Sequence, residues 1–131
     1  DYGHIINVGS VAGLMPGGPY MATYYATKSY VVSLTNALAE ELKLLGSHAQ
    51  VHALCPGPVN TEFNDVANVK FSLKGISARE CVSYCIDEAD KGKIIIVPNM
   101  MVKVAAIASK FVPREIVLGI VARSQKSKIE R

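Results

Sequence analysis

The sequence predicts an α/β protein built on a parallel sheet, and three observations support that prediction. Short, continuous apolar runs at residues 4–9, 50–55 and 94–97 indicate strands that are covered on both faces. Segments with the apolar spacing of helices lie between these runs. Strands joined by helical crossovers lie parallel, with helices packed on the sheet. We therefore expect three strands with covering helices, and neither an internal repeat nor a second domain.

The first strand ends in Gly9-Ser10, and only three residues precede it. A strand that is buried on both faces needs neighbours on both sides. We therefore expect this chain to be part of a longer one. The loop that follows the strand covers residues 11–22, and its strongest turn signal is Pro16-Gly17-Gly18-Pro19.

A long helix is expected over residues 24–45, because Gly46 is of the type favoured just past a helix C-terminus. Apolar residues recur along it at steps of three and four, which indicates one side that faces the core. They are Val31, Leu34, Leu38, Leu42 and Leu45. The second strand follows this helix and stops at Pro56-Gly57-Pro58.

Residues 58–75 are irregular and polar, and a connection of that length in a compact domain is usually functional. We interpret this segment as a flap. Ser77 and Glu80 then match the capping-box pattern, which predicts a helix over residues 78–90.

Two further helices are expected after the third strand, over residues 100–112 and 114–123, because Pro113 separates them. A polar tail, residues 124–131, completes the chain. We therefore divide one domain into a main part, residues 1–98, and a helical extension with a basic tail, residues 99–131.

The formal net charge of +3 is unevenly distributed. Residues 1–98 sum to −2 and residues 99–131 to +5, which is a basic tail and not a basic domain. Nucleic acid is therefore not an expected partner. The apolar and basic residues 99–131 suggest docking on an anionic membrane surface as one interpretation. We favour the other, in which they pack over a substrate pocket or against a second subunit.

Three cysteines, Cys55, Cys81 and Cys85, are too few for a disulfide framework and indicate reduced thiols in a cytoplasmic protein. Cys81 and Cys85 would share one face of a helix, but no further Cys or His pattern completes a metal site. We therefore expect core thiols and no bound metal.

The residues with the most evident chemistry are Ser10, at the end of the first strand, and Tyr24 and Lys28, at the start of the long helix. Tyr24 and Lys28 are four residues apart and so lie on one helix face, where an ammonium stabilises a neighbouring phenolate. A hydroxyl, a phenol and an ammonium together form a proton-transfer site. The alternative is that Tyr24, Tyr25 and Tyr30 only pack against the core. Tyr25 is the weaker candidate acid, because its fourth neighbour is a serine.

With these residues the sequence resembles the short-chain dehydrogenase/reductase family. Three segments match in the family's order: Asn7 to Gly13 (Asn-Val-Gly-Ser-Val-Ala-Gly), Tyr24 to Lys28 (Tyr-Tyr-Ala-Thr-Lys) and Pro56 to Thr61 (Pro-Gly-Pro-Val-Asn-Thr). The resemblance covers residues 4–97. It implies the C-terminal part of a Rossmann-like, doubly wound parallel sheet, incomplete as given.

The resemblance also implies roles for individual residues. Ser10, Tyr24 and Lys28 would be catalytic, and Tyr24 and Lys28 would also contact the cofactor. The turn after the second strand would line the nicotinamide and the pyrophosphate. Its residues are Pro56, Gly57, Val59 and Thr61. Thr61 has an alternative reading as a turn cap. The cofactor would be NAD or NADP, with NADP slightly preferred.

Two departures from the family pattern matter. The interval from Ser10 to Tyr24 is 14 residues, one longer than usual, and the Pro16–Pro19 turn offers room for the extra residue. The family's Gly-rich dinucleotide turn and its Asn-Asn-Ala-Gly segment, which precede the serine strand, have no counterpart in this sequence. We therefore expect a fragment that is inactive alone and does not bind nucleotide.

The predicted function is the interconversion of a small-molecule carbonyl and an alcohol by hydride transfer, with a tyrosine as the general acid and base. The family resemblance further implies a homodimer or tetramer. The alternative is a non-catalytic, Rossmann-like scaffold that completes its sheet with a partner. The intact set of Ser10, Tyr24 and Lys28 argues against a scaffold, which has no need of all three.

Overall fold

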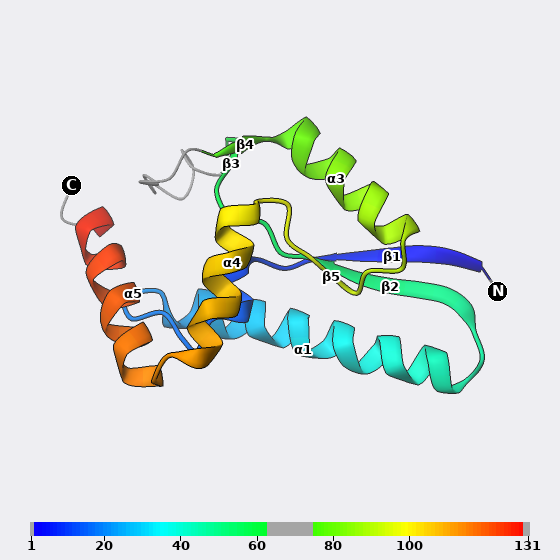
Figure 1. The fold of residues 1–131 in the computed structure, drawn as a ribbon, viewed down its shortest axis with the longest axis horizontal. Helices are drawn as coiled ribbons and strands as arrows, with labels where there is room; N and C mark the ends of the chain where they lie inside the picture. Colours follow the sequence, from blue (N-terminus) through cyan, green and yellow to red (C-terminus); the bar gives the residue numbers. More distant parts are fainter. Residues whose placement is uncertain (1, 63–74, 130–131) are drawn as a thin grey trace.

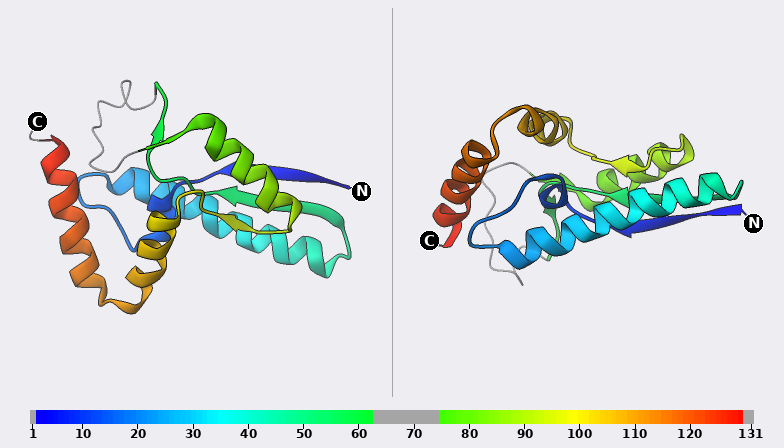
Figure 2. Two further views of the ribbon diagram at one scale, coloured as in Figure 1. Left: turned by 45° about the horizontal axis from the view of Figure 1, so that its top comes forward. Right: turned by 90° about the horizontal axis from the view of Figure 1, so that it is seen from below.

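A computed structural model describes residues 2–62 and 75–129 (Figure 1). Its centre is a parallel sheet with strand order β1-β2-β5, formed by Tyr2–Val8, His48–Leu54 and Ile95–Ile96. The long helix α1 (Ala22–Leu44) lies along one side of this sheet, and α3 (Ala78–Asp90) lies along the other (Figures 1 and 2). The predicted three-stranded parallel sheet with covering helices is confirmed.

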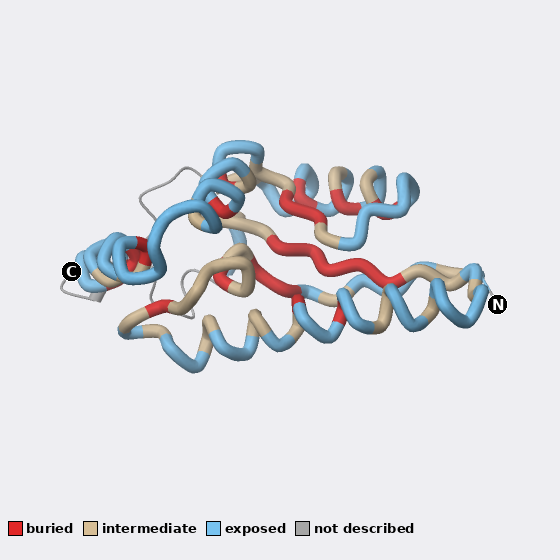
Figure 3. Tube along the Cα trace, turned by 60° about the horizontal axis from the view of Figure 1, so that its bottom comes forward, coloured by how far each residue is buried: buried red, intermediate tan, exposed pale blue. Residues whose placement is uncertain are grey.

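Strand β2 is the centre of the core, because its successive side chains point to opposite faces of the sheet. Ala53 and Cys55 belong to one cluster, together with Val32 of α1. Leu54, between them, belongs to a second cluster with Cys81 and Cys85 of α3. Both sheet faces are therefore buried at β2, and Figure 3 shows the buried residues concentrated along the middle of the molecule.

Strand β1 corrects one expectation, because it is not covered on both faces. It lies at the edge of the sheet and pairs only with β2, in a register that runs from Tyr2 opposite His48 to Val8 opposite Leu54. Ile5 and Val8 are 57% and 62% exposed. An apolar run identifies a surface that favours burial, but it does not say which element of the chain covers that surface.

Helix α1 begins two residues before the predicted start and ends one residue before the predicted end, with Leu45 as its C-cap and Gly46 at φ 66° beyond it. Its buried residues are Val32 and Thr35, not the leucines of the predicted stripe, and Leu34 and Leu45 remain exposed. The side of α1 that faces the sheet is therefore displaced by one residue. It is the side on which Lys28 lies, one turn before Val32.

Helix α3 has the predicted bounds, and its capping box is confirmed. The Ser77 hydroxyl accepts from the Glu80 N–H at 3.2 Å, and the Glu80 carboxylate accepts from the Ser77 N–H at 2.8 Å. The structure adds a small parallel pair that the sequence did not predict, β3 (Val59–Asn60) with β4 (Ile76–Ser77). This pair joins the two ends of the predicted flap, of which residues 63–74 lie outside the described part.

Two helices follow β5. The first, α4 (Met100–Ala108), tightens into a 3₁₀ turn, η2 (Ser109–Phe111), and so is shorter than predicted. The second, α5 (Arg114–Ile129), continues past residue 123 into the segment that was predicted to be a polar tail. The reason is Gln125, which is buried one turn after Val121 and extends the side of α5 that packs inward.

Candidate active site

The candidate site lies at the carboxyl ends of β1 and β2, where parallel sheets commonly hold their ligands. Backbone hydrogen bonds continue past the end of the strands and hold the two following segments together. The Gly9 N–H donates to the Leu54 carbonyl at 2.8 Å, and the Val11 N–H donates to the Pro56 carbonyl at 3.0 Å. The segment that carries Ser10 and the Pro56–Thr61 turn are therefore neighbours.

Ser10 is the N-cap of a short 3₁₀ helix, η1 (Val11–Leu14), and is buried. Its Oγ accepts a hydrogen bond from the Ala12 N–H at 3.1 Å. A serine hydroxyl has one proton to donate besides its acceptor sites. Because the Ala12 N–H occupies only an acceptor site, that proton is left for another oxygen.

Lys28 reaches from α1 back to the end of β1. Its Nζ donates to the Val8 carbonyl at 3.0 Å, two residues before Ser10, and lies 5.8 Å from the centre of the Tyr24 ring. The structure therefore brings the ammonium beside the predicted phenol and bonds the ammonium to the end of the strand that precedes Ser10. Tyr24 is half-buried, and the ammonium keeps two protons for other acceptors.

Gly13 sets how closely the Ser10 segment approaches α1. A Cβ added there would overlap the backbone carbonyl of Lys28. The Ser29 hydroxyl donates to the Gly13 carbonyl at 3.3 Å and holds the two segments at this distance. The spacing between the Ser10 segment and α1 is thus fixed by contact between backbones.

Tyr25 differs from its neighbour, because its hydroxyl accepts a hydrogen bond from Gln125 Nε2 of α5 at 2.9 Å. Gly18 packs so closely on the Tyr25 ring that a Cβ there would overlap it. Burial raises the pKa of the Tyr25 hydroxyl above its ordinary value, although the bond from Gln125 opposes this. Tyr25 is therefore engaged in packing, which favours Tyr24 as the acid. Sequence reasoning missed Gln125; its spacing of four from Val121 indicates that it lies on the inward side of α5, but not which residue it contacts.

Cys55 lies beneath the site, with its Sγ next to Gly9. Burial raises the pKa of this thiol to about 11, although the Ser10 backbone N–H and the Lys28 ammonium both favour the thiolate. It is therefore a protonated packing group at neutral pH. Cys81 and Cys85 are also free and buried. Within residues 2–62 and 75–129, no three His, Cys, Asp or Glu side chains are arranged to hold a metal ion.

The turn after β2 holds the residues that the family resemblance assigned to the cofactor. Gly57 packs against Val102 of α4, close enough that an added Cβ would lie 2.9 Å from a Val102 methyl group. Val59 lies in β3, and Thr61 follows it in an exposed position. The turn is therefore joined to the strand end at Pro56, while Thr61 lies farther along the chain at the surface.

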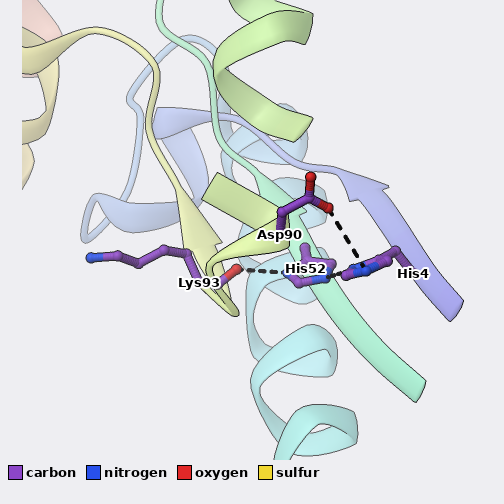
Figure 4. Close-up of polar contacts among 4 residues, drawn as sticks. All are labelled: His4, His52, Asp90 and Lys93. Atoms are coloured by element: carbon purple, nitrogen blue, oxygen red, sulfur yellow. Dashed lines mark hydrogen bonds and ion pairs between the residues drawn. The ribbon is translucent and has the colours of Figure 1, made fainter. Parts of the chain in front are cut away.

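A second polar cluster lies midway along β1 and β2, next to the turn before β5 (Figure 4). The Lys93 carbonyl accepts from His52 Nδ1 at 2.7 Å, so the other ring nitrogen of a neutral His52 can only accept. His52 Nε2 therefore accepts a hydrogen bond from His4 Nδ1, which lies 2.9 Å away. His4 Nε2 lies 3.9 Å from the Asp90 carboxylate. Sequence reasoning gave His52 no role, and here it joins β1, β2 and the turn before β5.

Comparison with known proteins identifies the family. Residues 1–70 match the model of the short chain dehydrogenase family, which is more than half of the chain. This chain belongs to the short-chain dehydrogenase/reductase family, as the sequence motifs predicted.

Two relatives illustrate the similarity. An uncharacterized oxidoreductase of Staphylococcus saprophyticus is 31% identical over 105 residues, which cover 70% of this chain and 42% of that protein. The inactive 2-(S)-hydroxypropyl-CoM dehydrogenase 2 of Xanthobacter autotrophicus is 51% identical over 57 residues, which cover 44% of this chain and 24% of that protein. The chain therefore spans less than half the length of these relatives.

Among solved structures, a short-chain dehydrogenase from Sphingobium yanoikuyae in complex with NADPH is similar, with a TM-score of 0.67 and 28% identity. The match covers 87% of this chain and 44% of that one. The fold is thus that of the Rossmann-type oxidoreductases of this family, of which the described elements make up one part.

Proposed function

We propose that this chain carries the proton-transfer site of an NAD(P)-dependent oxidoreductase that interconverts a carbonyl and an alcohol. The observation that supports it most strongly is the position of Lys28. Its ammonium is bonded to the Val8 carbonyl and lies 5.8 Å from the centre of the Tyr24 ring. One side chain thus connects the serine strand with the phenol.

The three side chains take different parts in the proposed reaction. Tyr24 donates a proton to the substrate oxygen during reduction and accepts it back during oxidation. Ser10 donates its remaining hydroxyl proton to the same oxygen and so holds the substrate in place. Lys28 places its positive charge beside the Tyr24 ring, and its two other protons suit the hydroxyls of a ribose.

The donors present fit the nicotinamide-ribose end of a dinucleotide. When bound, the nicotinamide supplies or accepts the hydride. Residues of the Pro56–Thr61 turn would line it, Pro56 and Gly57 nearest the strand end and Thr61 toward the phosphates. The similar Sphingobium enzyme binds NADPH, which supports a cofactor of this class. The preference for NADP over NAD, the dimeric or tetrameric state and the cytoplasmic location stay predictions.

The test uses the protein encoded by the complete reading frame. Turnover is measured with NADPH and with NADH on a panel of small ketones and aldehydes. Replacing Tyr24 by phenylalanine should lower turnover by about 10²-fold or more, because a positioned general acid contributes that much. Cofactor binding, followed by nicotinamide fluorescence, should persist.

Tyr25→Phe is the matched control, since it removes a neighbouring hydroxyl that is already bonded to Gln125. It should keep turnover within a few-fold of the unmodified protein. Equal losses in both variants, or full turnover in Tyr24→Phe, would show that the acid is misassigned.

A second candidate is the non-catalytic scaffold, which one observation favours: the 51% identical Xanthobacter relative is named as inactive. A scaffold would show no turnover with either cofactor across the panel. Tyr24→Phe would then leave every measured property unchanged.

A further inference from the structure

Helix α4 has two opposite sides that are both apolar. Val102 and Ala106 are buried and face the rest of the protein. On the other side, residues at steps of four, three and four form a stripe that continues into η2. They are Met100, Val104, Ile107 and Phe111, which are 65%, 58%, 50% and 85% exposed. This outward stripe is a surface that water solvates poorly, and its spacing places it on one side of the helix.

Basic residues accompany the stripe. Lys103 and Lys110 are seven residues apart and therefore share one flank of it. Arg114 follows where α5 begins. Over residues 99–131 the sequence has seven basic and two acidic side chains. The surface of α4 and η2 therefore combines apolar and positively charged groups.

Helix α3 gives a comparison within the same chain. It also has two exposed apolar residues on its outer side, Val82 and Ile86, at 52% and 49%. The same helix has one basic residue, Arg79, one turn before Val82, and four acidic ones: Glu80, Asp87, Glu88 and Asp90. Exposed apolar residues thus occur on two helices, but those of α3 lie in an acidic setting and those of α4 in a basic one.

We propose that the outward stripe of α4 and η2 rests on the surface of an anionic lipid membrane. A helix that lies in the interface needs an apolar side that enters the boundary of the acyl chains and cations that reach the headgroups. Lys103 and Lys110 can extend their charged ends to the headgroups while their stems lie along the stripe. No helix in the described part is long and apolar enough to cross a membrane.

Two features favour a membrane over other occupants. In a symmetric pair of copies joined through this face, the lysines of both would meet and repel each other. Further strands added to the sheet at β1 would lie far from it, since α4 follows β5 at the other edge of the order β1-β2-β5. Figure 1 shows α4 and α5 at the end of the molecule away from the free tip of β1.

The test is flotation of the protein encoded by the complete reading frame with lipid vesicles. Vesicles of neutral phosphatidylcholine are compared with vesicles that contain anionic phosphatidylglycerol and phosphatidylcholine in a ratio of 3:7. Both kinds of vesicle are tested at low and at high salt. We expect binding to the anionic vesicles to be about tenfold stronger, and to weaken as salt rises. The double variant Ile107→Ser and Phe111→Ser should lower this binding about tenfold. Lys103→Gln with Lys110→Gln should reduce it to the level of neutral vesicles.

Val82→Ser with Ile86→Ser is the matched control, because it removes two similarly exposed apolar residues among acidic ones. It should bind like the unmodified chain, and circular dichroism should show equal helix content in all variants. Any one of three results would overturn the proposal. The protein does not bind anionic vesicles, the α3 control loses as much vesicle binding as the α4 variants, or the α4 variants bind as well as the unmodified protein. The stripe would instead belong to an interface with a second copy if two results came together. The protein would run as a dimer in size-exclusion chromatography, with the dimer lost in the α4 variant, and it would not bind vesicles.

Discussion

The middle of the β1–β2 pair and the segments beyond its carboxyl end are held by different kinds of contact. Midway along the strands the contacts are made by side chains, from His4 to His52 and on to the Lys93 carbonyl. Beyond the carboxyl end they are mainly between backbone groups: Gly9 with Leu54, Val11 with Pro56, and Gly13 against Lys28 of α1. Backbone contacts leave the side chains of Ser10 and Tyr24 available for a ligand, whereas the middle of the strands uses its polar side chains for its own stability.

The largest expected effect tests the carboxyl end. Replacing Gly13 by alanine should lower the free energy of unfolding by about 3 kcal/mol, because the new Cβ would overlap the Lys28 carbonyl and the backbone would have to move. Gly119→Ala is the matched control, since nothing lies within 4 Å of that position on α5. It should be neutral or stabilising by up to about 1 kcal/mol. Urea unfolding measures both, and a mild effect of Gly13→Ala would refute the close contact.

The second effect tests the middle of the strands. His52→Ala should cost about 2 kcal/mol in unfolding free energy, because it removes a fully buried side chain and its hydrogen bonds to the Lys93 carbonyl and His4 Nδ1. His48→Ala, at an exposed position on the same strand, should change stability by less than about 0.5 kcal/mol. If the two variants were equally stable, the side-chain contacts would not stabilise this part of the sheet.

The smallest effect concerns Cys55, a side chain at the carboxyl end that is buried and not available to a ligand. Its pKa is raised to about 11 in the folded protein from an ordinary 9.0. Between pH 9 and pH 11 the thiol of the unfolded chain has lost its proton, whereas the thiol of the folded chain keeps it. The unfolding free energy is therefore unaffected by this thiol below pH 9 and falls as the pH rises toward 11. At pH 10 the loss from this thiol should be about 1 kcal/mol.

The pKa values of Tyr25, Cys81 and Cys85 are raised in the same direction by burial, so the whole protein should lose stability in alkali. Cys55→Ala isolates one contribution: the fall in unfolding free energy between pH 8 and pH 10 should be smaller in the variant. Parallel curves for the two proteins would show that Cys55 titrates normally.

Local signals in the sequence predicted most of the fold. The bounds of α3 followed from the capping box of Ser77 and Glu80, because both partners lie within one turn. The exposure of β1 could not be predicted, since it depends on what covers the strand. The small β3–β4 pair was also missed, because two-residue strands that meet across a long connection have no periodicity of their own.

For the candidate site, the sequence predicted that Ser10, Tyr24 and Lys28 would be neighbours, and the geometry agrees with this for Lys28 and Tyr24 directly. The roles of these residues stay predictions. The contact of Gln125 with Tyr25 could not be predicted, because 100 residues separate them and the helix that carries Gln125 continues past its expected end.

The register of β1 on β2 has a consequence for the order of folding. Tyr2 pairs with His48 and Val8 with Leu54, so every contact of the pair closes a loop of more than forty residues. Helix α1 can form within microseconds, whereas the strand pairing must wait for that closure. The contact between α5 and Tyr25 spans a still longer loop. We expect α5 to dock last during refolding and its amides to exchange with solvent first in the native state.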